Sequence, residues 1–136
     1  MSAAHINEAD VRAEVAAAFA AYEAALLVND SVRLTGFFWN DPRAIRYGLA
    51  ENLHGAAEIA AFRAARPGDD LARELAHTTI TTFGRDFATA CTLFRRRESG
   101  RTGRQMQCWA RLPEGWRIVA AHVSFLDFPW DSPWPA

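Results

Sequence analysis

The second half of the sequence consists mainly of four long segments that favour β-strands, separated by short turn sequences. Glycine marks the turns at 98–101 and 113–115, as expected of hairpin connections. Long strands joined by tight turns pair antiparallel in one sheet, and their intrinsic twist prevents that sheet from staying flat. We therefore expect a curved antiparallel sheet, with strands at 73–83, 87–97, 104–112 and 116–128.

The first half of the sequence predicts helices. A long helix is expected to begin near Asn7 and Asp10, which resemble a weak capping box. Capping residues at 29–31 end it and can begin a short second helix that reaches about residue 38, and a third helix is expected at 55–65. Apolar residues recur at helical spacing along the first helix and form one inward stripe: Val11, Val15, Ala18, Phe19, Tyr22 and Leu26.

Between the helices, a short strand is expected at 43–47, after a turn at 40–42 and before a loop at 48–52. Helices followed by long strands predict an α+β fold in which the curved sheet wraps around three N-terminal helices. Such a cone has an interior that is a natural ligand pocket. A length of 136 residues suits one domain, so we expect 1–136 to form a single unit.

The charge composition narrows the chemistry. The net charge of −1 provides no electrostatic reason to expect nucleic acid or a membrane surface as a partner. All 15 basic residues are arginine, which excludes lysine Schiff-base chemistry and assigns anion recognition to guanidinium groups. No apolar stretch approaches the roughly 20 residues that span a bilayer, and no secretory signal is recognisable, so a cytoplasmic protein is expected.

The hairpin at 98–101 predicts which residues share a face of the sheet. With Ser99-Gly100 at its centre, opposed residues have numbers that sum to 199, which pairs Cys91 with Cys108 as reduced thiols. One face is then apolar. The other combines amides with aromatic rings and is the better candidate for a pocket wall, although a solvated face is the alternative: Thr92, Phe94, Gln105, Gln107 and Trp109.

Tyr22 and Arg46 are the polar residues with the most conspicuous positions. Tyr22 is either a core tyrosine or a phenol that donates a proton or hydrogen bond to a substrate. Arg43 and Arg46 should point to opposite faces, so one of them is expected to point inward. An inward Arg46 needs an anionic partner, which is either Glu51 or Asp86, or else a substrate carboxylate.

Other candidate residues carry weaker signals. His122 and Ser124 are expected to share a face of the last strand with Ile118 and Ala120. The histidines lack metal-ligand spacing, so no metal site is expected. Neither a nucleophile elbow nor a glycine-rich phosphate loop is present, and no cofactor is expected.

Two regions carry a family resemblance. The first, at 29–55, contains the Trp-Asn-Asp-Pro-Arg motif at 39–43 and the Arg-Tyr-Gly motif at 46–48. The second, at 103–124, ends in His-Val-Ser at 122–124. Together they resemble the AtzH-like branch of the NTF2/SnoaL-like superfamily. The resemblance implies a cone fold, a homodimer formed through the sheet, and a role in bacterial ureide and cyanuric acid (s-triazine) catabolism.

The same resemblance implies an activity and a site. The activity is that of a decarboxylating amidohydrolase that converts 1,3-dicarboxyurea to allophanate without a metal or cofactor. Tyr22 and Arg46 fall where the family's catalytic pair falls. The pocket lining would come from the strands: Gln107, Trp109, His122 and Ser124.

Two other functions remain open from the sequence. The first is a non-catalytic module that binds a small carboxylate or assists an amidase partner, because one fold hosts many roles. The second is a proton shuttle of the steroid-isomerase type, which needs a carboxylate inside the pocket. Asp41 and Glu51 lie beside turns in the sequence, so we rank the proton shuttle last.

Overall fold

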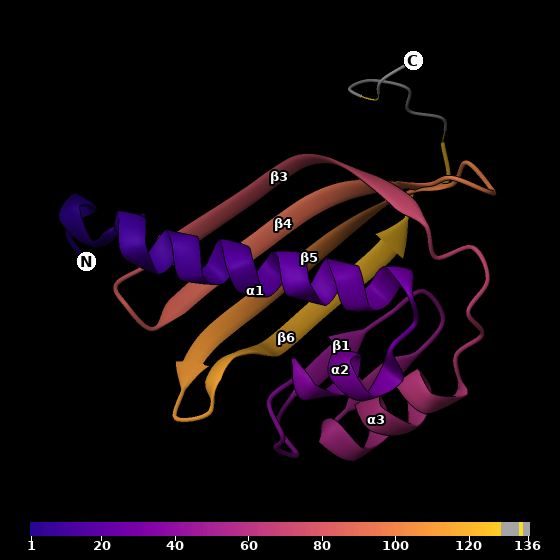
Figure 1. Ribbon diagram of the computed structural model, residues 1–136, viewed down its shortest axis with the longest axis horizontal. Helices are drawn as coiled ribbons and strands as arrows, with labels where there is room; N and C mark the ends of the chain where they lie inside the picture. The colour runs from indigo at the N-terminus through magenta and orange to yellow at the C-terminus, as the bar shows by residue number, and fades with distance from the viewer. Residues whose placement is uncertain (129–133, 135–136) are drawn as a thin grey trace.

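The computed structural model describes residues 1–128 and 134 (Figure 1). A 3-10 turn at Ala3–His5 precedes three helices: α1 (Ala9–Leu27), α2 (Ser31–Gly36) and α3 (Ala56–Ala65). Two short strands, β1 (Ile45–Tyr47) and β2 (Asn52–His54), lie between α2 and α3. Four long strands follow: β3 (Arg73–Phe83), β4 (Phe87–Arg96), β5 (Thr102–Leu112) and β6 (Gly115–Phe125).

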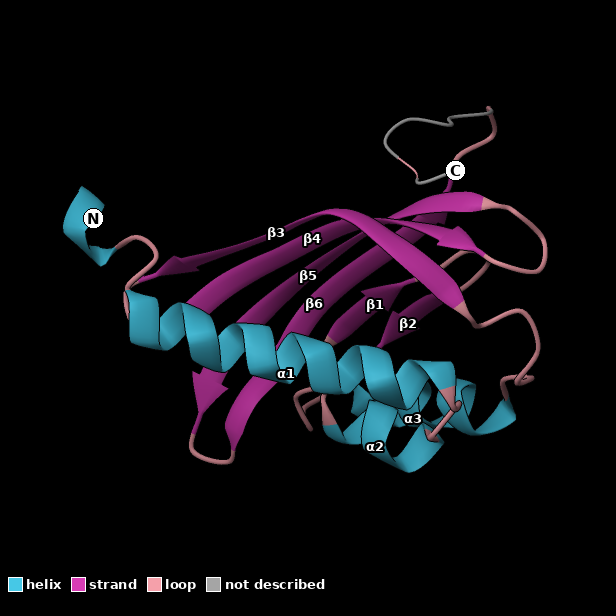
Figure 2. Cartoon of the chain, turned by 45° about the horizontal axis from the view of Figure 1, so that its top comes forward, coloured by secondary structure: helices cyan, strands magenta, loops and turns pink. Residues whose placement is uncertain are grey.

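The strands form one curved, open sheet in the order β2-β1-β6-β5-β4-β3. Helix α1 crosses the inner face of the long strands, while α2 and α3 lie below the β1–β2 end (Figures 1 and 2). This is the α+β cone that the sequence predicts. The sheet is not wholly antiparallel, because β1 pairs parallel with β6. After β2 the chain forms α3 and then β3, which lies at the opposite edge of the sheet from β2. The four long strands then follow one another across the sheet, so the last of them, β6, lies beside β1.

The predicted element bounds hold to within three residues, with two local errors. Residues 48–52 were expected to form a loop, but Asn52–His54 is strand β2, too short to show an alternating pattern. The expected capping box is wrong as well. Asn7 adopts a left-handed φ of 58°, and its Oδ1 accepts a hydrogen bond from the Thr82 backbone N–H at 2.9 Å. Asn7 therefore fastens the start of the chain to β3.

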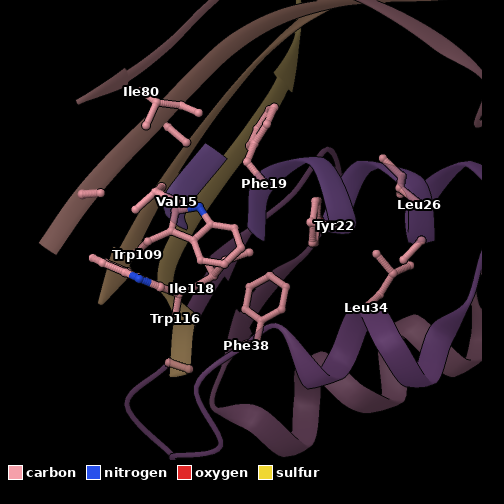
Figure 3. Close-up of a cluster of buried hydrophobic side chains, with 14 of the residues drawn as sticks. Val15, Phe19, Tyr22, Leu26, Leu34, Phe38, Ile80, Trp109, Trp116 and Ile118 are labelled. Atoms are coloured by element: carbon pink, nitrogen blue, oxygen red, sulfur yellow. The ribbon is translucent and has the colours of Figure 1, made fainter. Parts of the chain in front are cut away.

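The core forms where α1 meets the sheet (Figure 3). The α1 stripe is buried as predicted, apart from half-buried Ala18. Trp109 and Ile118 from the sheet and Phe38 from the segment after α2 pack against it. Burying a side chain of this size contributes about 1.5–3 kcal/mol. This packing holds Tyr22 in place near the open end of the cone.

The β4–β5 hairpin differs from its predicted register by one step, but its faces are as predicted. Opposed residues sum to 197, so Cys91 lies opposite Met106, and Cys108 lies opposite Thr89. The turn spans residues 97–101, and Gly100 takes the left-handed φ of 74°. A change of two in the sum leaves every residue on its original face. The amide and aromatic face is the buried one, which excludes the solvated alternative.

A β-bulge at Val119 changes the faces of β6. Trp109 pairs with Ile118, but the next pair is Cys108 with Ala120. The extra residue turns Ala120, His122 and Ser124 to the outer face, since it shifts the alternation by one position. The expectation that His122 and Ser124 share a face with Ile118 is therefore wrong.

Candidate active site

A cavity of about 290 Å³ lies between the C-terminal half of α1, the end of α3 and the sheet. Its lining is unusually rich in charge for a small pocket. Four arginines and three acidic residues contribute to it, drawn from segments far apart in the chain: Arg46, Arg66, Arg73, Arg96, Glu51, Asp69 and Asp70. Tyr22, Leu26, Phe62 and Leu71 supply the less polar part of the wall.

Tyr22 lines this pocket and belongs to the buried cluster between α1 and the sheet (Figure 3). The side chain is 3% exposed, and its ring packs edge-on against Phe37 and Phe38 at centroid distances of 5.8 and 6.5 Å. Its hydroxyl accepts a hydrogen bond from Nη2 of Arg63 at 2.5 Å. Burial raises the pKa of Tyr22, but the guanidiniums of Arg63, Arg46 and Arg73 outweigh it, and the pKa falls below its ordinary value.

Arg63 is a component of the site that the sequence analysis missed. It is 1% exposed, and within the described part of the chain it pairs with no carboxylate. Nε and Nη1 have no hydrogen-bond partner among those residues, and burial lowers the pKa of this group. The sequence feature that could have identified Arg63 is its position four residues after Ile59, which places both side chains on the buried face of α3.

Arg46 points inward from β1 and is 6% exposed, whereas Arg43 points outward and pairs with Asp41. Nη1 of Arg46 lies 2.8 Å from Oε1 of Glu51. Glu51 is one of the partners of Arg46 that the sequence analysis anticipated. It engages one guanidinium nitrogen, and no other hydrogen bond of that group is found among the described residues. Part of the guanidinium therefore remains available to a ligand.

Glu51 lines the pocket, although its position beside a turn suggested otherwise. Its carboxylate contacts Arg46 and also accepts a hydrogen bond from the Ala50 backbone N–H at 3.1 Å. The Glu51 carboxylate is therefore already engaged by a cation and by a backbone donor. Asp86, the other anticipated partner of Arg46, instead pairs with Arg111 at 3.3 Å.

The remaining arginines of the pocket differ in their partners. Arg73 binds Glu23, with Nε and Oε2 3.1 Å apart, and also donates to Oε1 of Gln105 at 3.0 Å. Arg96 lies 3.8 Å from Asp70. The Arg66 guanidinium has neither an ion pair nor a hydrogen bond to another described residue, and lies 5.9 Å from the Phe62 ring. Burial, together with the nearby Arg63 and Arg46, lowers the pKa of Arg66 to about 10.

The structure brings together some of the predicted site residues and separates others. Gln107 borders a cavity of about 10 Å³ beside Tyr22 and Arg46, and its Oε1 accepts a hydrogen bond from Nε1 of Trp109 at 3.1 Å. Trp109 is fully buried in the core and does not line the 290 Å³ pocket.

His122 and Ser124 are not placed as expected. His122 borders the small cavity, but its side chain is exposed on the outer face and packs edge-on against Tyr47 at 6.3 Å. Ser124 lies opposite Arg104 on the same outer face. The bulge at Val119 is the reason for both corrections.

Within residues 1–128 and 134, no group of three or more His, Cys, Asp or Glu side chains could hold a metal ion. None of the described helices is long and apolar enough to cross a membrane. The described pocket therefore presents arginines, carboxylates, an amide and a phenol as its polar groups.

Comparisons with known proteins agree with this architecture. A family model described as AtzH-like matches residues 4–129. A DUF3225-family protein of unknown function from Pectobacterium atrosepticum is 54% identical, with a TM-score of 0.91 over 93% of this chain and 99% of that one. A cystatin-like fold protein from Burkholderia xenovorans is 47% identical, with a TM-score of 0.86 over 91% and 98%.

A more distant solved structure is an NTF2-like superfamily protein from Salmonella enterica. It is 25% identical, with a TM-score of 0.68 over 93% of this chain and 98% of that one. No match was found among the curated proteins.

Proposed function

The chain belongs to the AtzH-like family of the NTF2-like superfamily, and on that premise we propose that it is a cofactor-independent hydrolase. Its reaction is the decarboxylating hydrolysis of a small N-carboxylated urea such as 1,3-dicarboxyurea, with allophanate as the product. Arg46 binds a substrate carboxylate, and Tyr22 donates a proton or a hydrogen bond.

The observation that carries this proposal is the surplus of guanidinium groups around the pocket. Arg46 is engaged through one nitrogen, and Arg66 pairs with no carboxylate in the described part of the chain. The two guanidiniums lie 4.9 and 5.9 Å from the same Phe62 ring. Because guanidinium forks match carboxylates in geometry and charge, a compact substrate with two carboxylates suits this arrangement.

The chemical step requires one proton transfer in this pocket. The N-carboxylate leaves as CO₂ when its C–N bond breaks and the bonding electron pair returns to nitrogen. Water then hydrates the CO₂ to bicarbonate, which makes the net reaction a hydrolysis. Tyr22 supplies the proton that this nitrogen takes up, and solvent later restores the phenol. Arg46 orients the carboxylate, so that the bond to be broken lies near the phenol.

The direct test compares two inward side chains with outward side chains of the same residue type. Tyr22→Phe and Arg46→Ala should each abolish CO₂ release from 1,3-dicarboxyurea while the circular dichroism spectrum stays native. The matched controls, Tyr47→Phe and Arg43→Ala, change a tyrosine and an arginine whose side chains point away from the pocket. Turnover that survives in Tyr22→Phe or Arg46→Ala would remove that residue from the mechanism.

The second candidate is a non-catalytic module that holds a small carboxylate or assists an amidase partner. Arg66, which has no ion pair within the described residues, favours anion binding in either case. Thermal-shift measurements with dicarboxylates would detect binding for both functions. Only an assay for CO₂ release separates them, because a module without catalysis releases none.

A further inference from the structure

Arg63 and Tyr22 form an unusual buried pair. A guanidinium keeps its proton in proteins, so Arg63 carries a positive charge although it is 1% exposed. Buried charges are normally paired with an opposite charge, because isolated burial is costly. Among the described residues, the hydrogen-bond partner of the Arg63 side chain is the Tyr22 oxygen, and two of its nitrogens lack a partner.

The Tyr22 oxygen is a group that could become the missing anion. It accepts a hydrogen bond from Arg63 at 2.5 Å, and no acceptor for its own proton is found in the part of the chain that the structure describes. That proton is free to be transferred to a ligand, since Tyr22 lines the pocket. Once the proton leaves, the phenolate oxygen faces a guanidinium already in hydrogen-bond contact.

We propose that Arg63 is a positioning residue: it orients the Tyr22 oxygen and stabilises the phenolate that remains after Tyr22 has transferred its proton. This inference rests on the proposed function, in which Tyr22 is the donor. In the step, the phenol O–H bond breaks and an N–H bond forms on the leaving urea nitrogen. The phenolate then recovers a proton from solvent.

The electrostatic surroundings agree with this role. Burial alone raises the pKa of Tyr22, but Arg63, Arg46 and Arg73 together lower it. An acid works best when its pKa lies close to the working pH, because an ordinary tyrosine gives up its proton too reluctantly. Arg63 makes the direct contact, so its removal should have the largest effect.

The experiment is an ultraviolet absorbance titration of tyrosinate, which needs no substrate. The chain has two tyrosines, so Tyr47→Phe leaves Tyr22 as the one phenol that titrates. In that background we expect Tyr22 to ionise below its ordinary value of about 10. Adding Arg63→Met should raise the midpoint above that of the Tyr47→Phe parent, and Arg63→Lys should raise it less because the charge remains. Arg66→Met removes a pocket arginine that does not touch Tyr22 and should move the midpoint least.

Two results would overturn the assignment. One is a Tyr22 midpoint at or above 10 in the Tyr47→Phe parent, and this readout does not depend on whether Arg63→Met folds. The other is a midpoint that Arg63→Met leaves unmoved while circular dichroism remains native. If the titration behaves as expected but 1,3-dicarboxyurea is not consumed, the proposed function fails and the Arg63–Tyr22 pairing stands.

Discussion

Tyr22→Phe should destabilise the protein far more than the loss of one hydroxyl suggests, because it leaves Arg63 without its partner. The substitution keeps the ring and therefore the edge-on contacts with Phe37 and Phe38. It removes only the oxygen that accepts from Arg63 at 2.5 Å. Nε and Nη1 of Arg63 already lack partners among residues 1–128 and 134, so the buried guanidinium would lose the one hydrogen bond that it makes there.

The expected magnitude follows from the loss of this contact. A hydrogen bond to a charged group contributes about 1.5–3 kcal/mol, and breaking a buried ion pair costs about 3–5 kcal/mol. The pocket beside Tyr22 admits water, which favours the smaller figure. We expect the free energy of unfolding to fall by about 2–3 kcal/mol. At about 3–4 °C per kcal/mol for a chain of this size, Tm should fall by about 6–12 °C.

Urea unfolding followed by tryptophan fluorescence measures the free energy, and a thermal scan measures Tm. The decisive comparison is with the double variant Tyr22→Phe/Arg63→Met. This variant also removes the buried guanidinium of Arg63, so it should be more stable than Tyr22→Phe alone. Tyr47→Phe is the matched control and should change stability by less than about 1 kcal/mol, as is usual for exposed positions. The reasoning is refuted if Tyr22→Phe matches the parent, or if the double variant is less stable than Tyr22→Phe.

Three further predictions concern packing, pH and assembly. A Cβ at Gly103 would lie within 3 Å of the Phe94 ring and 2.6 Å from a backbone carbonyl. Gly103→Ala should therefore lower the free energy of unfolding, measured in urea, by about 1–3 kcal/mol. Gly36→Ala is the control and should not destabilise the protein, because the space around Gly36 is open. Because the Tyr22 pKa is lowered on folding, the unfolded chain binds more protons between the folded pKa and about 10. The stability of the parent relative to Tyr22→Phe should therefore rise with pH in that window, and a flat difference in urea titrations would contradict the lowered pKa. We propose a homodimer formed through the outer face of the sheet, where Met106 is 60% exposed. Met106→Glu should therefore shift the chain from dimer to monomer in analytical sedimentation. A parent protein that already sediments as a monomer would contradict the dimer.

Much of the fold was predictable because its signals are local. The stripe on α1 and the alternation on β4 and β5 arise from backbone periods of 3.6 and 2 residues, which need no knowledge of the rest of the chain. The face assignment even survived a wrong hairpin register, because the error moved the pairing by an even number. Tyr22 and Gln107 were placed on the buried side for the same reason.

The positions of the candidate site residues were predicted less accurately than the fold, because the errors depended on single residues. One extra residue at Val119 reversed the faces of His122 and Ser124, and periodicity cannot reveal a bulge. Trp109 faces inward as expected, but it is buried in the core and does not line the pocket. The alternation placed one of Arg43 and Arg46 inward without deciding which. The contact of Arg46 with Glu51 was one of three alternatives until the structure showed the turn between them.

The sequence by itself determined the order of helices and strands, the inward faces of α1, β4 and β5, and the restriction of anion binding to arginine. The tertiary structure decided which arginines meet. Arg46, Arg63 and Arg73 come from β1, α3 and β3, and their charges converge on Tyr22 because the fold brings these three elements together around α1. Whether a buried guanidinium has a partner depends on residues distant in sequence, and the Arg63–Tyr22 contact joins residues 41 positions apart.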